Sequence, residues 1–256
     1  MVHDVTADSI MTRLEAEQLA MASDEEITQY AAQCCAHGNA VSAETLTGNW
    51  VGHLAMHHDV VVPALHRLDR RGRTMDFACG AGRLSLLMGG MGFRQVVGVD
   101  SSCAALARAA QVAHDEVFVR ILGDGTLPFP PECFDNVVSM IAIQHIQFFP
   151  VRWRYFQEFR RVLRPDGRLL IQVNADDRGP GIGWFERGRS DRYVAPDCVT
   201  DEAELERYLL AAGFQPLEMW RTPMDTVNVS WETNLTGRKD GWLWVLAAKG
   251  EPADAA

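Results

Sequence analysis

The chain has 256 residues, of which 47% are apolar, and this is enough for one large domain with a sizeable core. Its 24 Lys and Arg residues face 34 Asp and Glu residues, and the formal charge of -10 disfavours a surface that follows a phosphate backbone. The six cysteines have no CxxC spacing, which argues against a zinc ribbon or a thioredoxin-type pair and favours reduced thiols in a cytoplasm.

Neither a secretory signal nor a membrane span is expected. Asp4 and Asp8 stand where a signal peptide carries positive charge, and no uninterrupted apolar run approaches the roughly 20 residues of a span. We therefore expect a cytoplasmic protein.

The N-terminal part is expected to be helical. Residues 8–36 are rich in Ala, Glu and Gln with apolar positions at helical spacing, which predicts one or two amphipathic helices in a cap over residues 1–48. A further helix is predicted over 50–68, where Pro63 either kinks it or begins its last segment.

From residue 74 the pattern changes to short apolar runs separated by helical stretches, which predicts an α/β fold with a parallel sheet covered on both faces. The strands are predicted at 75–78, 96–99, 117–122, 137–141 and 169–173, and the helices at 82–91, 102–113 and 151–163.

The C-terminal part contains an unusually long connection. Residues 174–200 are rich in Gly, Arg and aromatic side chains, and we interpret them as a lid-like insertion in a domain that spans 49–250. A helix over 201–212 and strands over 214–220 and 242–248 are predicted to follow, and 251–256 are expected to be a disordered tail.

The stretch "TMDFACGAGRLSLLM" predicts a strand, a glycine turn and a helix N-terminus, which together present backbone N–H groups to a ligand. A dinucleotide site would need a third glycine where Ser85 stands, and Asp76 would repel a pyrophosphate. A ligand with a cation and no phosphate fits better, and S-adenosylmethionine has an ammonium and a sulfonium.

The chain resembles the class I S-adenosylmethionine-dependent methyltransferases, in particular their small-molecule, type 11/25-like branch, over 50–173 and more weakly to 249. The stretch "DFACGAG" is similar to the family's DxGxGxG turn, with Ala78 in place of the first glycine. The stretches "VVGVDSS", "GDGTLPF", "FDNVVSMIAIQHI" and "RRVLRPDGRLLIQV" resemble its later strands and turns. The resemblance implies a Rossmann-like, doubly wound, mostly parallel seven-stranded sheet with an antiparallel last strand, plus an N-terminal helical cap.

The resemblance also implies a cofactor site for S-adenosylmethionine. Asp100 would accept hydrogen bonds from the ribose hydroxyls, with Ser101 beside the adenine, and Asp124 and the Gly125 N–H would meet the adenine ring. Taken singly, Asp100 or Ser101 also fits an N-cap and Asp124 a turn residue, but three predicted strand ends point into one crevice. The cofactor-binding residues expected are Asp76, Ala78, Gly80, Gly82, Asp100, Ser101, Asp124, Gly125 and Ile141.

Just beyond the fourth predicted strand, His145 is the candidate catalytic base, because a histidine pKa lies near neutrality. The alternative is a histidine packed between helices, and Gln144 either orients substrate or caps a helix. His53 and His57 have the i, i+4 spacing of a zinc pair, but there is no third ligand and no HExxH motif. We therefore expect no metal and treat His57 or His58 as a pocket residue.

Two aromatic residues of the insertion, Trp184 and Tyr193, are hard to place in a core and suggest a lid over the acceptor. Arg187, Arg189 and Arg192 either hold an anionic group of the acceptor or are solvated charges.

The function expected from the sequence is methyl transfer from S-adenosylmethionine to a small-molecule acceptor, with a slight preference for oxygen, as in secondary metabolism. In-line displacement in an enclosed pocket needs mainly proximity and exclusion of water. The alternatives are a protein of this fold that catalyses a non-methyl reaction such as a cyclisation or only binds ligand, and an NAD-dependent oxidoreductase, which Asp76 and Ser85 disfavour. A small-molecule partner is expected, without nucleic acid or membrane, and a homodimer is left open.

Overall fold

A computed structural model of the chain describes residues 13–40, 57–113, 115–175, 182–191, 198–222 and 242–250. For His57 and His58 it describes the backbone alone. Tyr193, Arg192, His53 and the expected tail over 251–256 lie outside the described residues.

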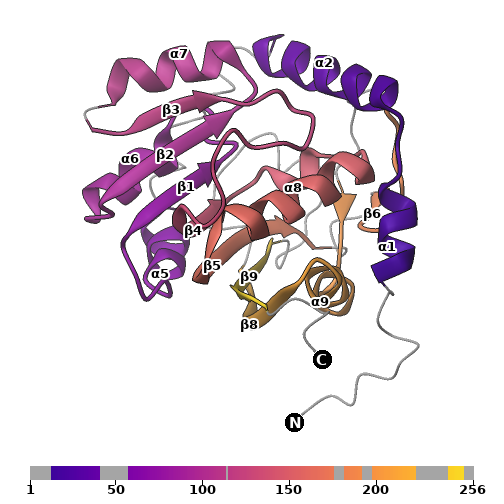
Figure 1. The fold of residues 1–256 in the computed structure, drawn as a ribbon. Helices are drawn as coiled ribbons and strands as arrows, with labels where there is room; N and C mark the ends of the chain where they lie inside the picture. The colour runs from indigo at the N-terminus through magenta and orange to yellow at the C-terminus, as the bar shows by residue number, and fades with distance from the viewer. Residues whose placement is uncertain are drawn as a thin grey trace.

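The centre of the molecule is a seven-stranded sheet in the order β3-β2-β1-β4-β5-β9-β8 (Figure 1). Strands β1 to β5 are parallel, and β9 runs antiparallel to both β5 and β8, which confirms the expected fold class. The strands are β1 (Arg73–Phe77), β2 (Gln95–Asp100), β3 (Val117–Arg120), β4 (Phe134–Ser139), β5 (Leu163–Asn174), β8 (Phe214–Thr222) and β9 (Trp242–Lys249).

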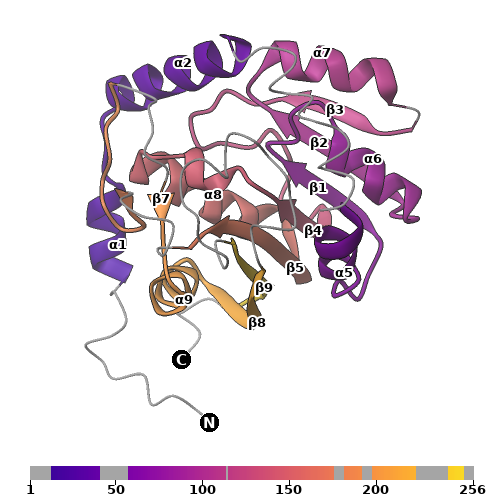
Figure 2. The ribbon, with the colours of Figure 1, turned by 180° about the vertical axis from the view of Figure 1, so that it is seen from behind.

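The central strands are buried on both faces, which explains why they read as continuous apolar runs. On β5, Leu169 and Ile171 belong to one core cluster and Leu170 to the other. Figures 1 and 2 show α8 (Phe149–Val162) and α9 (Glu202–Ala211) on one side of the sheet, with α5 (Val62–Leu65) and α6 (Arg83–Gly90) on the other.

The helix ends follow from local chemistry. α7 (Cys103–Val112) begins where the Ser102 hydroxyl accepts a hydrogen bond from the Ala105 N–H at 3.2 Å. Asp201 caps α9 in the same way, and Gly213 after that helix adopts φ +80°. The helix predicted over 50–68 is observed in its described part as a π-helical turn (His57–Val61) followed by α5, so Pro63 lies in the first turn of α5 rather than at a kink.

Two helices precede the sheet, α1 (Arg13–Ala20) and α2 (Asp24–Ala40). They separate at Ser23, which forms a capping box with Glu26: the Glu26 N–H donates to the Ser23 hydroxyl at 3.2 Å, and the Ser23 N–H donates to the Glu26 carboxylate at 2.9 Å. The residues at the start of α2 therefore determine where this helix begins.

The described part of the insertion packs onto the domain. Two-residue strands β6 (Ile182–Gly183) and β7 (Cys198–Val199) pair there, and the Trp184 side chain is 0% exposed against Tyr208. The expectation that Trp184 lies outside the core is wrong. The cause is Arg152, a fully buried arginine that donates to the Trp184 carbonyl and stacks on its ring.

Among the described helices, none is long and apolar enough to cross a lipid bilayer.

Candidate functional site

The turn between β1 and α6 has an unusual backbone. Ala78, Gly80 and Gly82 adopt φ values of 58°, 55° and 80°, all in the left-handed region. For alanine this conformation costs about 1–2 kcal/mol, so Ala78 holds a glycine-type geometry against its own preference. The sequence substitution at this position therefore leaves the path of the turn unchanged.

The two glycines of this turn have different reasons to be glycine. A Cβ built on Gly80 would meet nothing within 4 Å, whereas one on Gly82 would lie 2.9 Å from the Phe118 ring. The backbone at Gly80 thus borders open space where a ligand can approach, and Gly82 allows the helix to pack closely.

Asp76 is buried at the end of β1, with 2% of its surface exposed. The Ser85 hydroxyl donates to its carboxylate at 2.6 Å, and burial raises the pKa of Asp76 to about 7. Sequence reasoning treated Ser85 only as a missing glycine; its role as the partner of Asp76 follows from the i, i+9 geometry of a strand, turn and helix. The Arg83 guanidinium nearby has a buried Nη1 without a partner among the described residues.

Asp100 ends β2 and ties the turn to that strand. One carboxylate oxygen accepts from the Gly80 N–H at 2.9 Å and the other from the Ser102 N–H at 2.8 Å, while burial raises its pKa. A carboxylate has about four lone-pair sites, so capacity stays available for a hydroxyl donor of a ligand. Ser101 is half-buried beside it and is not the helix cap, since Ser102 takes that role.

Asp124 follows β3, and its side chain stabilises the turn in which it lies. Its Oδ1 accepts from the N–H and the hydroxyl of Thr126, at 2.9 and 2.7 Å, as a turn residue does. Its other oxygen accepts no bond from the described residues. Gly125 adopts φ +91°, and a Cβ there would lie 2.6 Å from the Arg154 Cβ, so this position requires glycine. Adenine recognition by this pair stays a prediction.

The segment after β4 carries strain and unsatisfied polar groups. Ile141 adopts φ +51°, which is a genuine outlier for a β-branched residue and is typical of functional sites. Gln144 is 0% exposed, and neither atom of its amide has a partner among the described residues. An unpaired buried amide costs free energy, which a ligand that offers both a donor and an acceptor would recover.

A second buried glutamine, Gln172 on β5, was not among the predicted site residues. It too is 0% exposed with both amide atoms unpaired among the described residues. Its signal in the sequence was a polar residue in the apolar run "LLIQV". A polar side chain in a strand covered on both faces needs a partner from outside the sheet.

Helix α2 crosses the carboxyl ends of several strands. Near the end of β2, the Ser102 hydroxyl donates to the Gly38 carbonyl at 3.0 Å. After β3, a Cβ on Gly123 would lie 3.5 Å from the Ala31 carbonyl oxygen. Figures 1 and 2 both show α2 beside the start of α7 at this edge of the sheet. The cap therefore covers the edge where Asp76 and Asp100 lie.

His145 lies under the same helix, in the short 3-10 helix Ile143–His145. The Tyr30 hydroxyl donates to the His145 carbonyl at 3.4 Å. Burial, and then the nearby His145, lower the pKa of His37. Tyr30 and His37 are seven residues apart on one face of α2, a signal that sequence reasoning missed. The structure leaves the roles of His145 as base or as packed residue untested.

Other predicted residues are not brought to this site. Arg187 donates to the Leu19 and Met21 carbonyls at 3.2 and 2.6 Å, and Arg189 pairs with Asp191 at 2.6 Å, so both have structural partners. The substrate roles of Trp184, Tyr193 and His57 stay predictions, the last two because their side chains lie outside the described residues. Within the described residues, no cluster of His, Cys, Asp and Glu could hold a metal ion.

Known proteins are similar to this chain over the same strands and helices. The protein-family model described as "Methyltransferase domain" matches residues 75–171, from β1 to β5. A tRNA U34 carboxymethyltransferase of Methylococcus capsulatus is 26% identical over 175 residues, covering 67% of this chain and 51% of that protein. A 27-O-demethylrifamycin SV methyltransferase of Amycolatopsis mediterranei is 31% identical over 104 residues, covering 39% of this chain and 37% of that protein. The chain thus spans about half or less of these relatives' length.

Among solved structures, a 1,6-didemethyltoxoflavin-N1-methyltransferase of Burkholderia thailandensis, bound to 1,6-didemethyltoxoflavin and S-adenosylhomocysteine, has a similar fold. The TM-score is 0.63 at 24% identity, covering 90% of this chain and 92% of that one. Residues 75–171 therefore match a family model described as a methyltransferase domain, and the fold of the chain is similar to that of a methyltransferase.

Proposed function

We propose that this protein transfers a methyl group from S-adenosylmethionine to a small-molecule acceptor held beneath α2. The observation that carries the proposal is that the buried carboxylate of Asp76 and the half-buried carboxylate of Asp100 lie beside the same turn, where the backbone of Gly80 is open. This arrangement suits a ligand with a cation and a diol and repels phosphate.

The residues present fit the cofactor. The carboxylate of Asp100 is oriented by two backbone N–H groups and keeps lone pairs for ribose hydroxyls. Asp76 would face the ammonium group of the cofactor. Burial raises the pKa of this carboxyl, and the positive charge of the ligand would favour its ionised form. The absence of a side chain at Gly80 leaves room for the nucleoside to lie on the turn.

The chain's own contribution to the chemistry is positioning. The bound cofactor supplies an electrophilic methyl group on a sulfonium. α2 excludes water from the edge of the sheet, and Gln144 offers both a donor and an acceptor to orient the acceptor molecule. Where that acceptor is a hydroxyl, the His145 imidazole would take its proton.

The size and charge of the acceptor are the finer part of the proposal. The tRNA-directed relative raises a nucleic-acid acceptor as the alternative. Three features favour a small molecule: the formal charge of -10, the acidic strand ends at Asp76, Asp100 and Asp124, and the cover that α2 provides. A polynucleotide would have to bring its phosphates against these carboxylates.

The test uses cofactor labelled in its methyl group. The purified protein is incubated with a cell extract divided into a small-molecule fraction and an RNA fraction, and label is followed into each. Label in the small-molecule fraction is expected. Asp100→Asn should weaken binding of S-adenosylhomocysteine roughly 10- to 100-fold in calorimetry, as for a lost hydrogen bond to a charged group.

The matched control is Asp115→Asn, which removes the same charge from an exposed position. Equal binding by both variants would remove Asp100 from the site. Label only in RNA would contradict the small-molecule acceptor, and cofactor binding without label in any fraction would favour a non-methyl reaction.

A further inference from the structure

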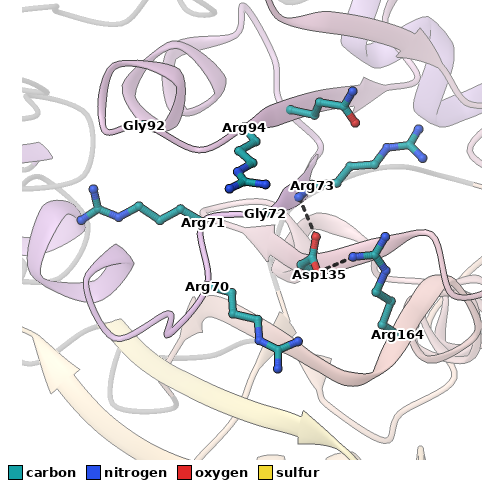
Figure 3. Close-up of a pocket in the computed structure, with 9 residues that line it drawn as sticks. Arg70, Arg71, Gly72, Arg73, Gly92, Arg94, Asp135 and Arg164 are labelled. Carbon is teal, nitrogen blue, oxygen red and sulfur yellow. Dashed lines mark hydrogen bonds and ion pairs between the residues drawn. The ribbon is translucent and has the colours of Figure 1, made fainter.

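A concave site lies at the edge of the sheet opposite to that of Asp76 and Asp100. A cavity of about 690 Å³ is formed where β1, β2, β4 and β5 begin, far along each strand from Asp76 and Asp100 (Figure 3). Its volume lies in the range of roughly 300–1,000 Å³ that small-molecule sites occupy. The residues that line it are Arg70, Arg71, Gly72, Arg73, Gly92, Arg94, Gln95, Asp135 and Arg164.

The charge of this cavity contrasts with that of the protein. Five of its lining residues are arginines and one is an aspartate, in a chain with a formal charge of -10. A concave surface lined by one sign of charge concentrates the field and attracts oppositely charged ligands. No aromatic side chain lines the cavity, so it offers charge without a stacking platform.

Asp135 carries the one carboxylate among the lining residues, and both of its oxygens already accept hydrogen bonds from the protein. One oxygen of Asp135 accepts from the Arg164 guanidinium at 2.6 Å, and the other accepts from the Arg73 backbone N–H at 2.7 Å. Gly72 makes this possible, because a Cβ there would lie 2.1 Å from the Asp135 oxygen. Asp135 therefore fixes the wall of the cavity and does not neutralise the remaining arginines.

Two of the five arginines are engaged elsewhere. Arg70 pairs with Asp166, and Arg71 donates to the Met91 carbonyl. Figure 3 shows both side chains directed away from Asp135.

The positive charges of Arg73 and Arg94 are not neutralised by an acidic side chain of the described residues. Neither side chain has a hydrogen bond or ion pair with the described residues, and the Arg73 Nε is buried without a partner. The Arg73 guanidinium is held 4.8 Å from the centre of the Phe134 ring, and Figure 3 shows Arg94 directed toward Gly72. Guanidinium groups bind phosphate oxygens in a bidentate geometry, and two of them can serve two phosphoryl groups.

We propose that this cavity binds a small ligand through a diphosphate group, with Arg73 and Arg94 as the principal contacts and Arg164 at the rim. The ligand is either free pyrophosphate or the diphosphate of a nucleotide. The limited size of the cavity and the lack of aromatic side chains favour such a ligand over an RNA strand, which needs an extended track of positive charge. The site is independent of the proposed methyl transfer and is tested without cofactor or acceptor.

The experiment is calorimetric titration of the full chain with inorganic pyrophosphate at constant ionic strength, compared with sulfate, AMP and ADP. We expect one bound pyrophosphate per chain, sulfate and AMP bound more weakly, and an affinity that Arg94→Gln lowers by about tenfold or more. Arg94 is exposed, so its replacement leaves the core intact. The matched control is Arg13→Gln on α1, 58% exposed, which removes the same charge and should leave affinity unchanged.

The arms also separate the two sources of the diphosphate. Equal affinities for ADP and pyrophosphate indicate recognition of the diphosphate alone, and tighter binding of ADP indicates a nucleotide; both support the site. The proposal is overturned if pyrophosphate does not bind, if sulfate binds as tightly, or if Arg94→Gln binds like the wild type. It is also overturned if an RNA oligonucleotide binds in an Arg94-dependent way while pyrophosphate does not.

Discussion

Asp76 couples the stability of the protein to pH. An aspartate in an unfolded chain has a pKa of about 3.9, and burial raises that of Asp76 to about 7. Between these values the folded protein keeps a proton that the unfolded chain has lost. The contribution of Asp76 to the free energy of unfolding therefore falls as pH rises from about 4 to about 7, the opposite of a salt-bridged carboxylate.

Asp76→Asn should remove this dependence. The variant keeps a partner for the Ser85 hydroxyl but cannot ionise, so we expect it to match the wild type near pH 4 and to exceed it by roughly 3–5 kcal/mol near pH 8. Urea unfolding of the ligand-free proteins at the two pH values measures this. A constant difference between the two proteins would show that Asp76 is ionised throughout.

His145 is the residue whose role most affects the mechanism. Replacement by glutamine should lower kcat on a hydroxyl acceptor by roughly 10²- to 10⁴-fold, as for loss of a general base, and leave affinity for S-adenosylhomocysteine unchanged. The acid limb of the pH–rate profile should disappear as well. An unchanged rate and profile would make His145 a packed residue beneath Tyr30.

Single residues could be predicted where their position alone defines their role. Asp76 and Asp100 end strands, and the carboxyl ends of parallel strands meet at one edge, so the sequence was sufficient to place them together. Trp184 could not be placed, because the partner that buries it, Arg152, is distant in sequence. Gln172 was missed because a pattern of apolar residues does not reveal which buried polar group lacks a partner.

At the scale of elements, α2 depends on its N-terminal capping box. Ser23→Ala removes the acceptor for the Glu26 N–H and should destabilise the first turns of α2 by about 1 kcal/mol. Amide exchange there should accelerate roughly fivefold while the central strands are unaffected.

The control for this substitution is Thr28→Ala, at an exposed position of the same helix, where alanine is the better helix former. It should leave exchange unchanged or slow it. Equal acceleration in both variants would mean that the capping box does not set the stability of α2.

The strands themselves were largely predictable because a buried parallel strand leaves a strong apolar signal. The antiparallel direction of the last strand came only from the resemblance. The position of β9 between β5 and β8 was not predicted, since pairing order leaves no local trace in the sequence. The pair β6 and β7 was not predicted because two-residue strands are defined by their partners and not by their composition.

At the scale of the whole molecule, the two edges of the sheet differ in charge. Carboxylates gather where β1, β2 and β3 end, and arginines gather where β1, β2, β4 and β5 begin. A formal net charge does not reveal this division, which arises because parallel strands send all their carboxyl ends to one side.

Ligand binding at the acidic edge should stabilise the entire fold. S-adenosylhomocysteine at about 100 times its Kd contributes about 2.7 kcal/mol, which for a chain of this size raises Tm by roughly 5–10 °C. NAD should leave the Tm of Arg94→Gln, which lacks a principal contact of the basic cavity, unchanged, because Asp76 and Asp100 would meet its pyrophosphate at the acidic edge. Differential scanning fluorimetry with both ligands measures this, and a rise with NAD alone would favour an oxidoreductase.

The contacts that α2 makes with Ser102 and Gly123 have a kinetic consequence. Under the proposed function, a product held beneath α2 would be released when the helix lifts, so product release, rather than bond making, is expected to limit the rate of turnover. A more viscous medium should then slow the enzyme, even though it leaves the reacting atoms untouched.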